Sequence, residues 1–95
     1  MSASGGDSGA PVATDAVSIK NFAFVPATIT VKVGSTVSWT NADVDPHTVV
    51  DHGGTFQSPT LNTGDTYHHM FTAPGRYEYL CSIHPFMTAT VVVTP

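Results

Sequence analysis

The 95-residue sequence predicts an all-β fold class, a β-sandwich or barrel of about seven to eight strands. Three observations lead to this prediction. Apolar and polar residues alternate with a period of two in several short segments, which is typical of strands with one face in a core. Glycine, proline, asparagine and serine residues that favour turns separate these segments. No segment sustains the 3.6-residue period of an amphipathic helix.

The first half of the expected domain contains three strands, over residues 17–25, 28–33 and 36–40. The first ends at Pro26, and the turn Gly34-Ser35 separates the other two. In residues 17–20 and in the second and third strands the apolar residues occupy every second position, so within each of these segments they share a face. The residues expected to face inward from the second and third strands are Ile29, Val31, Val33, Val37 and Trp39.

Four further strands are expected in the second half, over residues 47–50, 66–72, 76–80 and 88–93. Residues 51–65 are rich in glycine, serine, threonine, proline and asparagine, so we expect an irregular segment there. Ala73-Pro74-Gly75 makes a turn between the fifth and sixth strands. The segment 81–87, between the last two strands, has no strand pattern and is expected to be a loop.

The chain is expected to comprise a flexible N-terminal tether, residues 1–14, and one domain, residues 15–95. The first segment is small and polar with three glycines, so it cannot bury enough apolar area to offset the entropy lost on ordering. Two interpretations stay open for it. It is either a frayed chain end or a spacer between the domain and a membrane anchor on a removed N-terminal segment.

Composition excludes two classes of function. Three lysine and arginine residues stand against seven aspartate and glutamate residues, which gives a net charge of -4. A basic patch that could neutralise phosphates is therefore not expected, and nucleic-acid binding is disfavoured. The apolar runs are short, so we expect no membrane-spanning segment.

The segment Cys81-Ser82-Ile83-His84-Pro85-Phe86-Met87 carries the chemistry. It places a thiol, an imidazole and a thioether three residues apart on one loop. Two imidazoles, one thiolate and a weak axial thioether form the blue-copper electron-transfer site. The second imidazole must come from elsewhere, and His47 is the best candidate because it lies between a polar loop and an extended run. We therefore predict a mononuclear copper site made of His47, Cys81, His84 and Met87.

From about Ala16 to Thr94 the sequence resembles the cupredoxins, the small type 1 blue copper proteins, and most closely their amicyanin, plastocyanin and pseudoazurin group. The resemblance rests on motifs along nearly the whole domain. These are Phe24-x-Pro26, Ile29-x-Val31, Gly34-x-x-Val37-x-Trp39-x-Asn41, Pro46-His47-Thr48-Val49, Gly64-Asp65, Phe71, and Pro74-Gly75-x-Tyr77-x-Tyr79-x-Cys81-x-x-His84-Pro85-Phe86-Met87.

The resemblance implies an eight-stranded Greek-key sandwich with one copper ion at one end, and an eighth strand would then lie within residues 51–65. It implies electron transport between redox partner proteins. The partners would dock on an apolar patch around His84, Pro85 and Phe86, where the edge of the loop histidine serves as the electron port. It also implies a monomer in the periplasm or outside the cell.

Relatives often carry asparagine after the first ligand histidine and proline before the second, whereas this chain has Thr48 and Ile83. From the resemblance we expect the Thr48 N–H near the Cys81 sulfur. Ile83, unlike proline, keeps an N–H that could also reach the sulfur. Acidic residues near His47 in the sequence either steer a basic partner or are solvated loop carboxylates; they are Asp43, Asp45 and Asp51.

Two alternatives to electron transfer stay open. The first is an extracytoplasmic protein that binds and delivers copper. The second is an enzyme, which we do not expect, because Cys81 and His84 share one tight loop with no orienting acid nearby. The sequence does not fix the roles of three further histidines. Core or interface packing is the expectation for His69, and a second, weak copper or zinc site with His68 or His52 is an alternative to solvent exposure.

Overall fold

The computed structural model describes residues 10–95, and these residues form nine β-strands and no helix. The strands are β1 (Val12–Ala13), β2 (Ala16–Lys20), β3 (Ala23–Val25), β4 (Thr28–Lys32), β5 (Thr36–Asn41), β6 (Val50–Asp51), β7 (Thr66–Met70), β8 (Gly75–Leu80) and β9 (Thr88–Thr94). The all-β prediction is confirmed.

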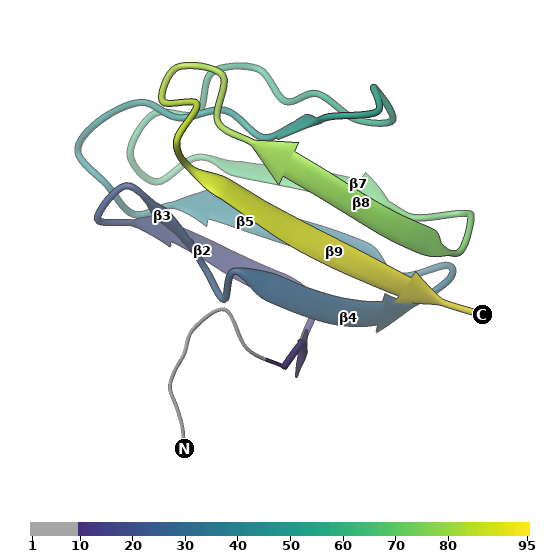
Figure 1. Ribbon diagram of the computed structural model, residues 1–95. Helices are drawn as coiled ribbons and strands as arrows, with labels where there is room; N and C mark the ends of the chain where they lie inside the picture. The colour runs from purple at the N-terminus through teal and green to yellow at the C-terminus, as the bar shows by residue number, and fades with distance from the viewer. Residues whose placement is uncertain (1–9) are drawn as a thin grey trace.

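The strands form two sheets (Figure 1). One has five strands in the order β1-β4-β9-β8-β6, and the other has four in the order β3-β2-β5-β7. β4 runs parallel to β9 and β2 runs parallel to β5, while β8 and β9 form an antiparallel hairpin. The loop between β8 and β9 and the segment after β5 lie at the same end of the sandwich, opposite the C terminus.

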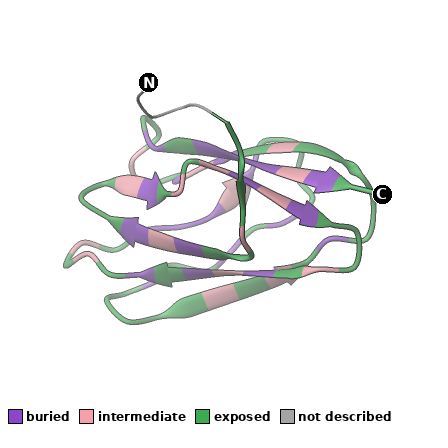
Figure 2. Cartoon of the chain, turned by 90° about the horizontal axis from the view of Figure 1, so that it is seen from below, coloured by how far each residue is buried: buried purple, intermediate pink, exposed green. Residues whose placement is uncertain are grey.

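The alternating sequence pattern places one face of each strand in the core. In β5 the expected inward residues Val37 and Trp39 are both 0% exposed, and in β4 Ile29 is 0% exposed. The expectation for Val33 was wrong, because β4 ends at Lys32 and Val33 is 40% exposed. The alternation of buried and exposed positions is visible along several strands in Figure 2. Trp39 lies at the centre, where its ring packs near those of Phe56, Tyr67, Phe71 and Tyr79.

The structure differs from the expected strand pattern between residues 17 and 25. The single strand expected there is a hairpin of β2 and β3, because Asn21 and Phe22 adopt left-handed backbone angles with φ of 54° and 56°. The other additional strand, β1, pairs with β4. In the segment 51–65, where an eighth strand was expected, only Asp51 belongs to a strand. Isolated β-bridges pair Gln57 with Val50 and Leu61 with His47.

The N-terminal tether predicted over residues 1–14 lies mostly outside the described residues, which begin at residue 10. Val12 and Ala13, at its end, pair with Ile29 and Thr30 of β4. Ordered sheet structure therefore begins before the domain boundary expected at residue 15. In residues 10–95, no helical segment has the length and apolar character needed to cross a bilayer.

Candidate metal centre

His47 is held by a buried network that begins at the end of β5. Asn41, which is 0% exposed, donates through Nδ2 to the carbonyl oxygens of Asp45 (2.9 Å) and Leu61 (2.8 Å). Its Oδ1 accepts a hydrogen bond from the N–H of Asp43. His47 and Leu61 then exchange two backbone hydrogen bonds of 3.0 and 2.7 Å. These contacts shape the loop after β5 and direct the His47 side chain, also 0% exposed, into the protein.

The β8–β9 loop presents the other predicted ligands. The N–H of Cys81 donates to the carbonyl of Met87 (3.1 Å), and the N–H of Met87 donates to the carbonyl of His84 (2.9 Å). These bonds fold the loop back on itself. Cys81 (0% exposed) and Met87 (2% exposed) therefore lie inside the domain, whereas His84 lies half-buried nearer the surface.

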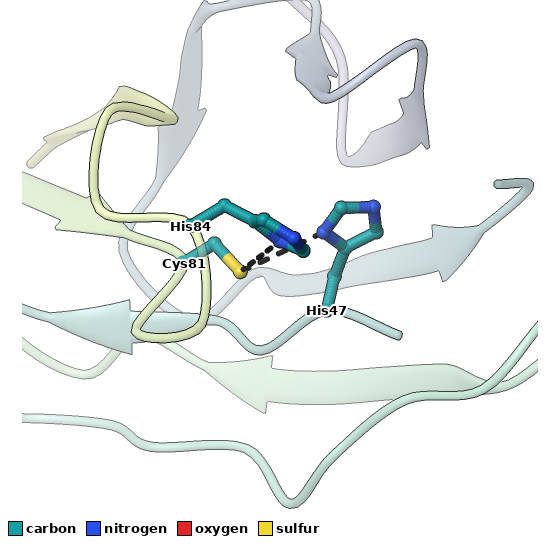
Figure 3. A group of neighbouring side chains, drawn as sticks. All are labelled: His47, Cys81 and His84. Carbon is teal, nitrogen blue, oxygen red and sulfur yellow. Dashed lines mark hydrogen bonds between the residues drawn. The ribbon is translucent and has the colours of Figure 1, made fainter. Parts of the chain in front are cut away.

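Three predicted ligand atoms converge between the two segments (Figure 3). The sulfur of Cys81 lies 3.6 Å from Nδ1 of His47 and 3.8 Å from Nδ1 of His84. All three donor atoms lie within 4.8 Å of one another. With bond lengths like those of zinc, about 2.3 Å to sulfur and 2.0–2.1 Å to nitrogen, the sulfur would lie about 3.5–3.8 Å from each nitrogen at tetrahedral to trigonal angles. The donor set therefore fits a small metal ion.

The donor chemistry favours copper. One thiolate and two imidazoles, with a thioether in the adjoining sequence, are the ligands of a blue-copper site. Met87 is buried on the same loop, and its backbone forms hydrogen bonds with Cys81 and His84. Among residues 10–95, His47, Cys81 and His84 form the only group of three histidine, cysteine, aspartate or glutamate residues close enough to share one ion. A second site with His68 or His52 is therefore not supported.

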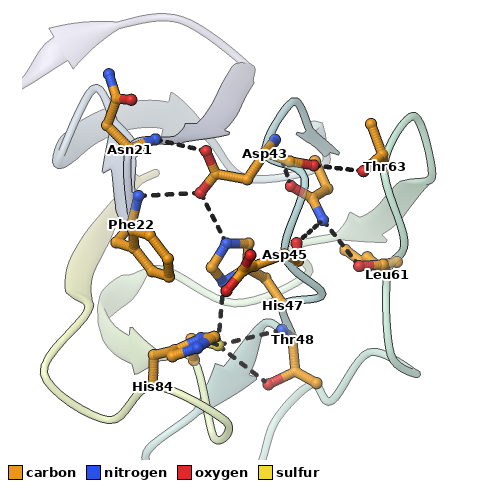
Figure 4. Close-up of polar contacts among 11 residues, drawn as sticks. Asn21, Phe22, Asp43, Asp45, His47, Thr48, Leu61, Thr63 and His84 are labelled. Carbon is orange, nitrogen blue, oxygen red and sulfur yellow. Dashed lines mark hydrogen bonds and ion pairs between the residues drawn. The ribbon is translucent and has the colours of Figure 1, made fainter.

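The His47 ring forms a hydrogen bond with Asp43. Nε2 of His47 lies 2.8 Å from a carboxylate oxygen of Asp43 (Figure 4). Because a carboxylate only accepts, Nε2 carries the proton, and Nδ1 keeps a free lone pair directed toward the sulfur. Partial burial acts to raise the pKa of the Asp43 carboxyl, but hydrogen bonds from Phe22, His47 and Asn21 outweigh it and lower the pKa below its usual value.

Thr48 links the two ligand-bearing segments. Its N–H donates to the Cys81 sulfur at 3.4 Å, which confirms the expected contact, and its hydroxyl donates to the same atom at 3.9 Å. The Thr48 hydroxyl oxygen also accepts from the N–H of Ser82 (2.8 Å) and bonds to the Ser82 hydroxyl (2.8 Å). Ile83 is not among the residues of the described chain that hydrogen-bond to the sulfur, so the second N–H expected from it is not found.

The Cys81 thiol is readily deprotonated in this environment. Burial acts to raise its pKa, but hydrogen bonds to the sulfur, first of all from the Thr48 N–H, outweigh burial and lower the pKa below its usual value. A thiolate is the form that binds metal, and coordination favours it further. The site is therefore prepared to bind a cation through sulfur.

Aromatic rings cover the outer side of the imidazoles. The Phe22 ring meets the His84 ring edge-on at 5.1 Å and the His47 ring at 5.6 Å, and Phe86 lies 6.2 Å from His84. Phe22 is 41% exposed and Phe86 is 71% exposed. With the exposed Pro85 they form an apolar surface around His84.

Sequence reasoning missed the roles of Asp43 and Phe22. The Asp43 carboxylate accepts three hydrogen bonds. Asp51 is 5% exposed, and its carboxylate accepts a hydrogen bond from the Thr55 N–H. Neither is therefore a freely solvated loop carboxylate. The position of Asp43 four residues before His47 was the one sequence feature that could have indicated their contact. Its other two partners, Asn21 and Phe22, lie more than twenty residues before it in the sequence. Phe22 was assigned to a continuous strand that the structure interrupts.

The remaining histidines are accounted for by packing and solvent. His69 lies half-buried between the rings of Phe56 (5.0 Å) and Phe71 (4.8 Å), as expected for a core histidine. Nδ1 of His68 hydrogen-bonds to the Ser38 hydroxyl at 2.9 Å, and His52 is exposed.

Comparisons with known proteins agree with this site. A family model for copper binding proteins, plastocyanin/azurin family, matches residues 11–94. Amicyanin-alpha of Methylorubrum extorquens is 38% identical over 89 residues, which cover 88% of this chain and 75% of that protein. Amicyanin of Paracoccus versutus is 34% identical over 91 residues, which cover 88% and 69%.

Solved structures show the same relationship. A novel purple cupredoxin from Nitrosopumilus maritimus superposes with a TM-score of 0.79 at 34% identity, over 85% of this chain and 100% of that one. The resemblance to cupredoxins is thus confirmed by sequence, by fold and by a donor set that fits a type 1 copper ion. The chain belongs to the plastocyanin/azurin family of copper-binding proteins.

Proposed function

We propose that this protein carries single electrons by means of one type 1 copper ion held by His47, Cys81, His84 and Met87. The observation that carries the proposal is the convergence of Cys81 Sγ with the two histidine Nδ1 atoms within 4.8 Å, at the end of the sandwich. Family membership supports it, because amicyanins and plastocyanins are type 1 copper electron-transfer proteins.

Each residue has a distinct role. When bound, copper supplies a one-electron couple between its two oxidation states. Cys81 contributes the anionic sulfur, and Thr48 donates hydrogen bonds that stabilise its charge. His47 and His84 contribute neutral imidazole nitrogens. Met87 lies buried on the same loop and would supply a weakly bound thioether.

The protein limits the movement of these donors. His47 is fixed by Asp43 and Leu61, and Cys81 by Met87 and Thr48, through the hydrogen bonds described above. Donors that are held in place by the fold rearrange little when charge is gained or lost. A small rearrangement keeps the barrier to electron transfer low, which is the property an electron carrier needs.

Electrons would enter and leave through His84. It is the half-buried imidazole, and the exposed residues Pro85 and Phe86 adjoin it. An apolar, weakly charged surface suits a brief encounter with a redox partner protein, with an interface below about 1,200 Å². We propose that the protein meets such partners as a monomer, and that it acts in the periplasm or outside the cell.

Copper delivery is the weaker alternative. Cys81 and His47 are both 0% exposed, so an acceptor protein could not reach these donors without opening the site. A delivery protein should lose copper to a chelator within a few redox cycles, whereas an electron carrier should retain it. No arrangement of the described residues favours an enzymatic function over electron transfer.

Absorption and paramagnetic-resonance spectra of the copper(II)-loaded protein test the proposal. We expect an intense visible thiolate-to-copper band and narrow hyperfine splitting. Cys81→Ser should abolish both, whereas Met87→Leu should retain the band with an altered symmetry of the resonance signal. A wild-type spectrum without the visible band would contradict the proposed function.

A further inference from the structure

Asp43 connects the proposed copper site to a distant hairpin. One carboxylate oxygen accepts a hydrogen bond from the N–H of Asn21 (2.7 Å). The other accepts from the N–H of Phe22 (3.0 Å) and from Nε2 of His47 (2.8 Å). Figure 4 shows these three donors around a single side chain. A loop carboxylate without a structural role would not collect three donors from two separate segments.

The hairpin turn depends on these contacts. Asn21 and Phe22 both have left-handed backbone angles, with φ of 54° and 56°. Asparagine tolerates this region, but a bulky residue such as phenylalanine rarely adopts it. Two consecutive N–H groups in this conformation point to the same side and can share one anion. The Asp43 carboxylate therefore stabilises a turn that is otherwise unfavourable for Phe22.

The strained turn places Phe22 against both proposed ligand imidazoles. Its ring is edge-on to His84 (5.1 Å, 81°) and to His47 (5.6 Å, 84°), and it lies 6.5 Å from the Phe86 ring. Phe22 thus covers the imidazoles on the side that faces solvent. Without the turn, its ring would have no constraint that holds it there.

We propose that Asp43 is a positioning residue of the copper site, which fixes His47 through Nε2–H and, through the Asn21–Phe22 turn, holds the Phe22 ring over His47 and His84. This inference rests on the proposed function, since it assigns a role toward the copper ligands. It goes beyond that function because the residues it adds lie outside the predicted ligand set.

The negative charge of Asp43 fixes the direction of its expected effect on the reduction potential of the copper ion. A carboxylate that accepts the distal N–H of a metal-bound imidazole makes the ring a stronger donor. The negative charge also favours the more highly charged oxidised ion over the reduced one. Asp43 should therefore lower the reduction potential, and its removal should raise it.

The test compares Asp43→Asn with Asp45→Asn. Both remove one negative charge from the same loop, but the hydrogen bonds described for Asp45 involve its backbone carbonyl, not its carboxylate. In Asp43→Asn, an NH₂ group replaces one accepting oxygen and faces a donor. We expect Asp43→Asn to retain the visible band and to raise the reduction potential clearly more than Asp45→Asn does. Equal shifts, or a larger shift in Asp45→Asn, would overturn the proposal.

Two further measurements decide the matter if Asp43→Asn does not fold. In nuclear magnetic resonance spectra of the metal-free wild-type protein, His47 should carry its proton on Nε2, and in the copper(I) protein the Phe22 and His84 rings should show a through-space contact. In the metal-free wild-type protein, the amide hydrogens of Asn21 and Phe22 should exchange about tenfold or more slowly than solvent-exposed amides. A proton on Nδ1 of His47, or unprotected amides at both positions, would refute the role of Asp43.

These outcomes separate the inference from the proposed function. A wild-type protein without the visible band refutes the copper assignment. The amide exchange of the metal-free protein still reports on the Asp43 contacts in that case. Conversely, a normal visible band with equal potentials in the two variants refutes only the role of Asp43.

Discussion

The two histidines of the site occupy opposite environments. His47 is 0% exposed, hydrogen-bonds to a carboxylate, and belongs to a segment pinned by Asn41 and Leu61. His84 is half-buried on a short loop, and its ring contacts two exposed phenylalanines rather than an acid. One imidazole is fixed by the β-sandwich, and the other is presented at the surface.

This difference separates two tasks within one donor set. A buried imidazole with a fixed proton keeps its geometry but cannot contact another protein. A half-buried imidazole in an apolar surface can conduct an electron to a partner but is held by fewer contacts.

The largest effect is expected from deleting each imidazole. His84→Gly would leave an opening at the surface that added imidazole can fill, whereas His47→Gly would leave an enclosed space beside Asp43. Both variants should lose the visible band of the copper protein. Added imidazole should restore the band in His84→Gly and not in His47→Gly, as followed by absorption. Equal rescue of both variants would show that the two sites are equally accessible.

The next largest effect is expected at Thr48, whose hydrogen bonds connect the His47 segment to the β8–β9 loop. Thr48→Val keeps the side-chain shape but leaves the Ser82 N–H without its acceptor. The free energy of unfolding should fall by about 1–3 kcal/mol in urea titrations. Thr66→Val, which removes an exposed hydroxyl pair with Thr40, is the matched control and should cost about 0.5 kcal/mol or less. Similar losses in the two variants would mean that Thr48 does not link the ligand segments.

A charged substitution tests the apolar surface around His84. Phe86→Asp places a carboxylate on the apolar surface beside His84, so two copies should repel each other there. Electron self-exchange, measured by line broadening in mixtures of the two oxidation states, should slow by about tenfold at low salt. Met70→Asp makes the same change at another exposed position, on β7, and should leave the rate near that of the wild type. Equal slowing in both would argue against His84 as the port.

His69 provides a third histidine environment and the smallest expected effect. Burial lowers its pKa, and the negative charge of Asp51 offsets this only in part. His69 therefore binds a proton less readily in the folded state than in the unfolded state. Its contribution to the free energy of unfolding is complete above the ordinary histidine pKa and is lost as the pH falls below that value.

The copper-loaded protein should accordingly lose more unfolding free energy between about pH 8 and pH 5 than His69→Phe does, because phenylalanine cannot be protonated. Urea titrations at the two pH values measure the difference. An identical pH dependence in both proteins would show that His69 is protonated equally well in the folded and unfolded states.

Most of the fold and the ligand set could be predicted because their signals are local. Alternation in residues 28–33 and 36–40 follows from strand geometry, and it correctly predicted the burial of Ile29, Val37 and Trp39. Cys81, His84 and Met87 lie on one loop, so their spacing is visible in the sequence itself. His47 was a weaker prediction, because it rested on its position between a polar loop and an extended run and on the family resemblance, and nothing local connects it to a loop more than thirty residues away.

The residues that could not be predicted depend on backbone geometry that the side-chain pattern does not encode. The apolar run through Phe22, Phe24 and Val25 is compatible with one strand, yet left-handed angles at Asn21 and Phe22 turn it into a hairpin. Only that turn brings two N–H groups to Asp43. The short strand β1 was missed because two residues are too few to show a period.

X-ray absorption fine structure at the copper edge, recorded for the oxidised and reduced protein, tests the central claim most directly. Our account predicts one sulfur at about 2.2–2.3 Å and two nitrogens at about 2.0–2.1 Å in both states, with little change between them. A first shell without a short sulfur distance, or the loss of a nitrogen neighbour on reduction, would contradict a site that the fold holds fixed.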